Sequence, residues 1–326
     1  MSKLLEVNNL HTYFRTKRGN IKAVNDASFS IEKGKTLGIV GESGSGKSVT
    51  SMSVLRILDH PGYIHSGSII FDGKEITELT EEEMRKIRGN DISMIFQEPM
   101  TSLNPVFKIG KQIGEVLRLH KGMTKAEARQ KSIEMLDAVG IPRPEEIVDN
   151  YSFQLSGGMR QRAMIAMALA CEPKLLIADE PTTALDVTIQ AQILVLMNDL
   201  KHKFGTSILF ITHDLGVISE MADDVVVMYA GQVVESAPMK KIFDEGLYSH
   251  PYTEGLLKSI PSIEDNKERL DVIEGSVPHP LNLPVGCKFS PRCKYATSKC
   301  FTEEPELINV AKDQQIRCFY PKKGER

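Results

Sequence analysis

The sequence predicts an α/β fold, with a parallel sheet covered by helices and a smaller, loop-rich segment at the C-terminal end. Two observations predict this fold. Residues 36–40, 175–178 and 207–211 are short, continuously apolar runs, which are typical of strands buried on both faces. Helical periodicity over residues 105–139 and 188–203 separates such runs, and alternating strands and helices favour a parallel sheet.

Length and composition exclude several function classes. A chain of 326 residues suggests two domains, or one large domain with an appendage. A net charge of −3, no Trp and only 6% aromatic residues disfavour a nucleic-acid partner. No apolar run approaches the ~20 residues of a membrane span, and the N-terminus lacks the apolar core of a secretory signal. We therefore expect a cytosolic protein with no nucleic-acid partner.

The elements follow one another in a regular order. Residues 1–35 alternate apolar and polar side chains, which indicates extended β structure. The strand at 36–40 leads into a glycine-rich loop at 41–46 and a helix from Lys47 to about Leu58. Further elements are expected as a strand at 92–96, helices over 105–139, a helix opening at 156–158 and running to 170, a strand at 175–178, a helix at 188–203, and strands at 207–211, 225–229 and 233–234.

Composition shifts near residue 236. Seven prolines lie between Pro238 and Pro291, with few apolar runs. We place the main domain at residues 1–235, with a helical subdomain at about 98–165, and a C-terminal extension at 236–326.

Residues 41–48 fit the pattern G-x-x-x-x-G-K-[S/T] between a buried strand and a helix. Glycines let successive backbone N–H groups converge on phosphate oxygens, and the helix N-terminus behind them adds a positive dipole end. We expect Lys47 to reach the β and γ phosphates and Ser48 to bind Mg²⁺. The loop therefore predicts a purine nucleotide and Mg²⁺, with contacts from Gly41, Ser43, Gly44, Ser45, Gly46, Lys47, Ser48 and Val49.

Two more segments carry chemistry of the same kind. The apolar strand at 175–178 ends in Asp179, expected to hold Mg²⁺ through water, and Glu180, expected to polarise the attacking water. Upstream, Leu-Ser-Gly-Gly-Met-Arg-Gln at 155–161 opens a helix with glycines and forms a second anion-binding helix N-terminus. One nucleotide does not need two such cradles from one chain.

In this order the motifs resemble the ATP-binding cassette (ABC) family over roughly residues 3–235. The resemblance implies a P-loop NTPase fold with a RecA-like core, an antiparallel β subdomain and a helical subdomain. It implies that two cassettes pair head to tail, so that Ser156, Gly157 and Gly158 complete the nucleotide site of the opposite subunit. It also implies a glutamine-loop residue that touches nucleotide and Mg²⁺, a D-loop aspartate after Ala184 and Leu185, and a switch histidine at the γ-phosphate, which here are Gln97, Asp186 and His213.

The family also stacks an aromatic side chain on adenine near the start of the domain. Tyr13 and Phe14 both fall in this region. Counting from Leu10 favours Phe14, and Tyr13 stays open as the alternative.

Four of the five cysteines fall in the last forty residues, at Cys287, Cys293, Cys300 and Cys318. Clustered cysteines in a cytosolic chain indicate a metal more than disulfides. With the stretches at 250–253 and 289–293, they resemble the C-terminal extension of oligopeptide and dipeptide transporter ATPases, which implies [4Fe-4S] ligation. Zinc and free or oxidised thiols stay open as alternatives, although no C-x₂₋₄-C pair typical of structural zinc is present. Cys171, in an apolar helix, is interpreted as a buried small hydrophobe.

The resemblance implies an ATP-hydrolysing subunit that energises import of di- or oligopeptides from the cytoplasmic face of the membrane. Its implied partners are a second ABC ATPase in a heterodimer, two integral membrane permease subunits that contact residues 100–110, and an extracellular or periplasmic peptide-binding protein. The alternatives are a non-transport ABC ATPase acting on nucleic acid or ribosomes, and an iron–sulfur electron carrier. The latter leaves the cassette motifs unexplained. The sequence leaves open whether dipeptides, longer peptides or nickel are transported.

Overall fold

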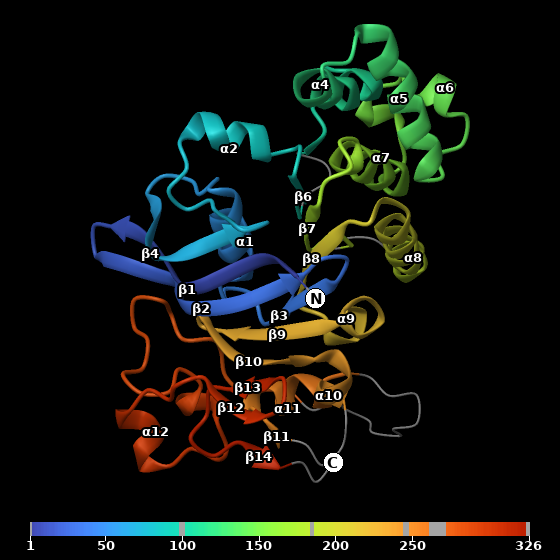
Figure 1. Ribbon diagram of the computed structural model, residues 1–326. Coiled ribbons are helices and arrows are strands. Elements are labelled where there is room, and N and C mark those ends of the chain that lie inside the picture. The colour runs from blue at the N-terminus through green and yellow to red at the C-terminus, as the bar shows by residue number, and fades with distance from the viewer. Residues whose placement is uncertain (1, 98–101, 183–185, 244–247, 261–271, 324–326) are drawn as a thin grey trace. The chain divides into compact units, whose positions relative to one another are not determined.

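The computed structural model describes residues 2–97, 102–182, 186–243, 248–260 and 272–323. The chain forms two compact units, which are described in turn (Figure 1). The first comprises residues 1–4, 32–35 and 78–211, and the second comprises residues 5–31, 36–77 and 212–326. Within the described ranges no helix is both long and apolar enough to cross a membrane. The predicted D-loop residues Ala184 and Leu185, and Met100 in the proposed permease contact, lie outside the described ranges.

The first unit contains three neighbouring parallel strands in the order β6, β7, β8, and all five residues of β7 are buried. The stretch at 105–139 is helical, as predicted, and it forms two helices that begin at Ile109 and Lys125. Thr124 caps the second helix with a capping box. The elements of this unit are α2 (Glu81–Ile87), β6 (Ile92–Ile95), α4 (Ile109–Lys121), α5 (Lys125–Ala138), α6 (Pro144–Ile147), η1 (Ser152–Gln154), α7 (Gly157–Leu169), β7 (Leu175–Asp179), α8 (Val187–Phe204) and β8 (Ser207–Thr212).

The second unit contains two groups of strands. One is antiparallel, in the order β2, β1, β4, β5. In the other, β12, β13, β10, β9 and β3 are neighbours. Among the described pairings of this group, β9 and β3 are parallel and the others are antiparallel. The strands and first helix are β1 (Lys3–Thr16), β2 (Gly19–Glu32), β3 (Thr36–Val40), α1 (Lys47–Leu55), β4 (Gly62–Phe71), β5 (Lys74–Glu75), β9 (Asp224–Tyr229) and β10 (Gln232–Pro238).

The remaining elements of the second unit are mostly short. They are α9 (Leu215–Met221), α10 (Met239–Phe243), β11 (Tyr248–Ser249), α11 (Pro251–Lys258), η2 (Ser290–Arg292), α12 (Ser298–Thr302), β12 (Ile308–Ala311), β13 (Gln314–Ile316) and β14 (Lys322–Lys323). Helix α1 ends earlier than the predicted residue 58, because Arg56 adopts a left-handed conformation with φ 53° and caps the helix.

Two features of the second unit were not predicted. Residues 62–75 form the strands β4 and β5, which complete the antiparallel group. The extension, expected to be loop-rich, contributes β13 beside β10, where Ile316 and Gln314 are buried. The strands β5, β12 and β13 have only two to four residues, which is too short to show a periodic pattern. Strand β13 is stabilised by pairing with β10, which is distant in sequence.

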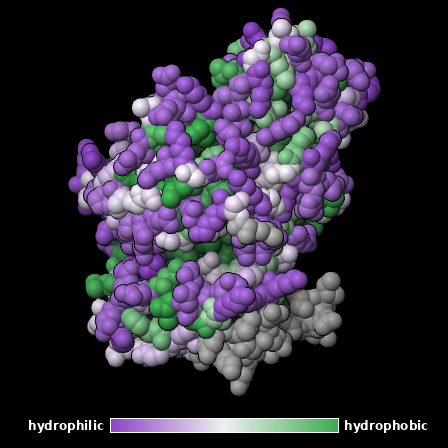
Figure 2. Space-filling model, viewed as in Figure 1, coloured by the Kyte–Doolittle hydropathy of each residue, from purple (hydrophilic) through white to green (hydrophobic). Residues whose placement is uncertain are grey.

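Hydrophilic residues dominate the face shown in Figure 2, and apolar residues form small scattered groups. Several large apolar side chains of the first unit are nevertheless solvent-exposed, including Val106 (70% exposed), Phe153 (64%) and Leu119 (75%). Isolated residues of this kind are common on protein surfaces.

Candidate nucleotide site and cysteine cavity

The phosphate-binding loop at 41–46 connects β3 to α1 in the second unit, as predicted. A Cβ on Gly41 would lie 2.2 Å from the Met228 carbonyl oxygen, so the loop can approach β9 only with glycine there. Gly46 has φ 97°, and a Cβ would lie 2.5 Å from the Ala23 carbonyl oxygen. Local backbone geometry therefore requires glycine at two predicted motif positions.

Lys47 is only 4% exposed, which is unusual for a lysine. Its Nζ donates hydrogen bonds to the carbonyl oxygens of Gly41, at 2.7 Å, and Glu42, at 3.1 Å. The ammonium group is thus held inside the curve of the loop. The hydroxyl of Ser45 is also buried and has no hydrogen-bond partner among the described residues, so this small loop contains both a buried cation and an unsatisfied polar atom.

In the first unit, the structure brings Gln97 and Glu180 together. The Gln97 Nε2 donates to Glu180 Oε2 at 3.0 Å. Asp179 ends β7 with 3% exposure, and the Glu180 N–H donates to the Ile211 carbonyl oxygen at 2.8 Å. Glu180 has φ 47°, a conformation that costs a non-glycine residue about 1–3 kcal/mol. A strained carboxylate at the carboxyl end of a buried parallel strand is typical of a functional position.

Ser156 is the N-cap of α7, and its hydroxyl accepts a hydrogen bond from the Met159 N–H at 3.3 Å. Ser156 and Gly157 are solvent-exposed, and a Cβ on Gly157 would meet no atom within 4 Å. Ser156 and Gly157 at this helix N-terminus are therefore accessible to solvent.

Asp186 and His213 also lie at element boundaries. Asp186 is the N-cap of α8, and its Oδ1 accepts from the Ile189 N–H at 2.9 Å. His213 is exposed and lies between β8 and α9, in the second unit with the phosphate loop. Sequence reasoning did not identify the capping role of Asp186, although an aspartate before a helix is a recognisable signal.

The two candidate adenine-stacking residues differ in their surroundings. Tyr13 is 8% exposed, its hydroxyl donates to Asn25 Oδ1 at 3.3 Å, and its ring stacks on His65 with centroids 4.6 Å apart. Phe14, one residue further along β1, is half-buried and packs against Gly62. Tyr13 and Phe14 therefore differ in burial and in ring partners, and both stay open as the residue that stacks on adenine.

Cys287, Cys293, Cys300 and Cys318 line one small cavity of about 20 Å³, together with His250 and Phe289. Burial, more than the neighbouring thiols, raises the pKa of Cys287 and Cys293, and raises that of Cys318 to about 11. The described residues contain no group of three or more His, Cys, Asp or Glu that could hold a metal ion. Cys171 is buried, at 1% exposure, as predicted.

His250 begins a helix in the stretch at 250–253 that resembles the transporter extension. It is the N-cap of α11, and its Nδ1 accepts from the Tyr252 N–H at 3.0 Å. Complete burial lowers its pKa to about 3, so the ring is neutral. The neutral ring acts here as a structural cap, with its Nδ1 already used.

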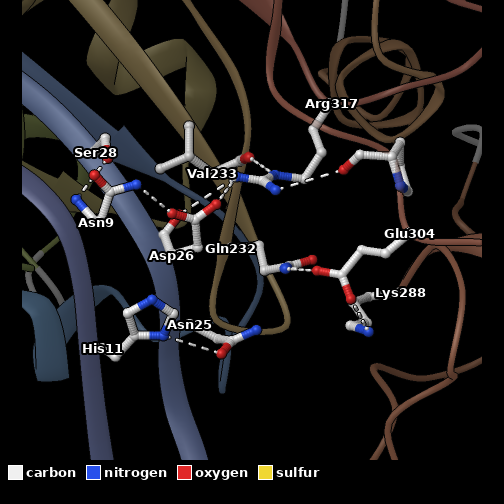
Figure 3. Close-up of polar contacts among 11 residues, drawn as sticks. Asn9, His11, Asn25, Asp26, Ser28, Gln232, Val233, Lys288, Glu304 and Arg317 are labelled. Atoms are coloured by element: carbon white, nitrogen blue, oxygen red, sulfur yellow. Dashed lines mark hydrogen bonds and ion pairs between the residues drawn. The ribbon is translucent and has the colours of Figure 1, made fainter. Parts of the chain in front are cut away.

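The extension is joined to the strands of the second unit by polar contacts (Figure 3). Arg317 donates to the Asp26 carboxylate at 2.9 Å and, through Nε, to the Val233 carbonyl oxygen at 2.9 Å. Glu304 accepts from Lys288 Nζ at 2.7 Å and from the Gln232 amide (Figure 3). These ion pairs join residues separated by up to 291 positions in sequence.

The extension also touches the phosphate loop. Arg292 Nη1 donates to both carboxylate oxygens of Glu42, at 3.1 and 3.0 Å, and the Tyr252 hydroxyl accepts from the Glu42 N–H at 2.8 Å. Sequence reasoning missed these contacts, because no local pattern reports an interaction across 250 residues.

Residues 24–183 match the ABC transporter family, and residues 234–300 match the family described as the C-terminal region of oligopeptide/dipeptide transporters. The chain is 59% identical to the oligopeptide transport ATP-binding protein AppD of Bacillus subtilis, over 99% of both chains. It is 53% identical to a protein of Brucella melitensis that is named as a peptide import ATP-binding protein, over 97% of this chain and 96% of the other.

Solved structures of ATP-binding cassettes are also similar. The dimeric cassette MJ0796 in a post-hydrolysis state with ADP and Pi gives a TM-score of 0.65 at 26% identity, over 72% of this chain and 99% of that one. The protein cbiO1 of Clostridium perfringens gives 0.63 at 28% identity, over 74% and 91%. Taken together with the loop at 41–48 and the full-length relatives, these similarities establish that the chain belongs to the ABC transporter ATPases of the oligopeptide/dipeptide importer type.

Proposed function

We propose that this chain binds and hydrolyses ATP to drive import of peptides through a membrane transporter. The observation that carries the proposal is the phosphate loop, where a buried Lys47 ammonium is held between a parallel strand and a helix N-terminus. Lys47 neutralises the β and γ phosphates, and loop N–H groups with the Ser45 hydroxyl donate to phosphate oxygens. Gly41, Ser43, Gly44, Gly46 and Val49 form the rest of this cradle, and Phe14 or Tyr13 stacks on adenine.

The remaining residues act on the γ-phosphate, on the Mg²⁺ that neutralises it, or on the paired cassette. Glu180 orients the attacking water and accepts its proton, while Gln97, already bonded to Glu180, holds the carboxylate in place. His213 contacts the γ-phosphate, and Asp186 acts near the paired cassette. Mg²⁺, when bound, neutralises phosphate charge, and the oxygen donors Ser48, Gln97 and Asp179 are of the type that it prefers. Ser156, Gly157 and Gly158 bind the nucleotide of the opposite subunit.

The partners follow from the transporter class. The chain acts at the cytoplasmic face of the membrane, paired with a second, different ABC ATPase. It couples to two permease subunits, which receive peptide from an extracellular or periplasmic binding protein. The exposed apolar side chains Val106 and Phe107, in the segment that follows Gln97, support a permease contact at residues 102–110. Residues 1–235 form the cassette and 236–326 the extension.

The four cysteines of the cavity are proposed to hold a [4Fe-4S] cluster, with zinc as the alternative. Four thiols around one cavity are a suitable donor set. No C-x₂₋₄-C pair typical of structural zinc is present in the sequence, which favours the cluster over zinc. A cluster would cross-link a segment with little apolar core.

Glu180→Gln tests the catalytic assignment. The amide keeps the shape of the side chain but cannot accept a proton, so hydrolysis should fall by about 10²–10⁴-fold while ATP binding is retained. Phosphate release and equilibrium ATP binding are the two measurements. Glu134→Gln, which changes an exposed carboxylate on α5, serves as the matched control. Hydrolysis at the unmodified rate in Glu180→Gln would contradict the assignment.

Iron and sulfide analysis after anaerobic purification tests the cluster. We expect about four irons and four sulfides per chain, as the cluster formula requires, and a broad visible absorption that disappears in Cys300→Ser. One zinc per chain without iron would favour the alternative. A chain with neither metal would leave the cysteines as thiols and reject both.

A further inference from the structure

A single residue of the phosphate loop, Glu42, receives two contacts from the C-terminal extension. Its carboxylate accepts two hydrogen bonds from Arg292, and its N–H donates to the Tyr252 hydroxyl. Backbone N–H groups are the phosphate ligands of such loops. The extension therefore fixes both the side chain and the backbone of a residue located where phosphate binds.

Arg292 is held so firmly that it can determine the position of Glu42. Its side chain is 5% exposed. Its Nε donates to the Glu274 carbonyl oxygen at 2.9 Å, and its Nη2 donates to the Ile273 carbonyl oxygen at 3.1 Å. A planar guanidinium with several fixed acceptors has little rotational freedom, so it acts as a rigid support.

The same segment forms part of the cysteine cavity. Arg292 directly precedes Cys293, and Phe289 lines the cavity. The Phe289 ring packs on Tyr252, with centroids 5.5 Å apart, and on Tyr229 of β9, with centroids 5.2 Å apart. Both routes from the cavity to Glu42, through Arg292 and through Phe289 and Tyr252, consist of buried groups in direct contact.

We propose that Arg292 and Tyr252 are positioning residues for the phosphate loop, and that through them the state of the cysteine cavity sets the affinity for ATP. Any change that shifts the segment at 289–293, such as alkylation of the thiols by iodoacetamide with release of iodide, moves the supports of Glu42. Coupling of two sites is reciprocal, so ATP binding must also change the accessibility of the cavity. The inference rests on the proposed function only in that residues 41–48 bind nucleotide.

Equilibrium ATP binding to the full chain is the first measurement. Arg292→Gln and Tyr252→Phe should each weaken ATP binding by about fivefold or more, the lower range of coupling between sites. Arg292→Lys should lie between Arg292→Gln and the unmodified chain, because an ammonium keeps the charge but loses the planar fork. Lys294→Gln, which removes an exposed charge next to this segment, should bind ATP as the unmodified chain does.

The rate at which iodoacetamide alkylates the four cavity cysteines, with iron release followed in the same samples, is the second measurement, and a purely structural role would not affect its ATP dependence. ATP should slow alkylation of the unmodified chain by about fivefold or more. This protection should be lost in Arg292→Gln and Tyr252→Phe.

Unchanged ATP affinity in both variants, or alkylation that ATP does not affect in the unmodified chain, would overturn the inference. Tyr252→Phe keeps the aromatic ring, so it provides the test if Arg292→Gln does not fold. Lys47→Ala tests the nucleotide site itself and should lose ATP binding whether or not the extension positions the loop. Normal ATP binding in Lys47→Ala would reject the assigned nucleotide site rather than the role of Arg292 and Tyr252.

Discussion

At the scale of single residues, the phosphate loop depends on the absence of side chains as much as on Lys47. Gly41 lies against the Met228 carbonyl oxygen, and a Cβ would have to displace the backbone of β9, because it would lie 2.2 Å from that oxygen. Gly114 in α4 is different, since its nearest contact would be Ala128 Cβ at 3.5 Å, an ordinary van der Waals distance. The same substitution should therefore have opposite effects at the two positions.

Gly41→Ala should lower the free energy of unfolding by about 1–3 kcal/mol, the usual cost of overpacking, and should abolish ATP binding. Gly114→Ala should be neutral or stabilising by up to about 1 kcal/mol, because alanine is the better helix former. Urea unfolding and ATP binding measure both effects. A Gly41→Ala chain with normal stability and affinity would show that the loop does not need this close approach.

At the scale of elements, helix caps position the predicted site residues of the first unit. Asp186 caps α8 and Ser156 caps α7, so both residues have a structural role beside the proposed functional one. Substitution of either therefore changes stability and activity together, unless the replacement keeps the cap.

Asp186→Ala should destabilise the chain by about 0.5–2 kcal/mol, whereas Asp186→Asn should leave stability unchanged, since asparagine caps as well as aspartate. Urea unfolding distinguishes them. If Asp186→Asn loses ATPase activity at full stability, the carboxylate itself acts in the paired cassettes. Equal destabilisation by both substitutions would show that the cap is unimportant.

The elements that the sequence predicted correctly are those with local signals. The strand β3, the loop at 41–48 and the helix α1 are encoded by an apolar run, glycines and a motif of eight residues. The strands β12 and β13 have no such signal, because β13 is stabilised by pairing with β10 and β12 by pairing with β13. The contact of Arg292 with Glu42 likewise could not be predicted from the sequence, since a motif identifies the loop but not the residues that support it.

At the scale of the whole molecule, the extension and the strands of the second unit are one folded body. Arg317 on the extension and Asp26 on β2 form an ion pair in which the arginine side chain is only 7% exposed. Burial raises the pKa of Asp26, but hydrogen bonds from Asn9 and Arg317 outweigh it, and the net pKa is lowered. Loss of this pair should therefore loosen the attachment of the extension.

The stability of this attachment should depend on pH. Because the folded-state pKa of Asp26 is lowered, its contribution is fully present above the unfolded pKa of about 3.9 and is lost as pH falls through the folded value. Asp26→Asn should cost about 1–3 kcal/mol at pH 7, since it weakens a hydrogen bond to a charged group, and the difference from the unmodified chain should shrink below about pH 4. Urea unfolding across pH measures it, and a difference that does not change with pH would contradict the assignment.

ATP hydrolysis by the chain reconstituted with its paired ATPase and permease subunits in lipid vesicles is the decisive measurement of peptide import. We expect a peptide-loaded binding protein to stimulate hydrolysis and drive peptide uptake, and Glu180→Gln to abolish both. Hydrolysis that ignores peptide and binding protein but increases with nucleic acid or ribosomes would contradict it.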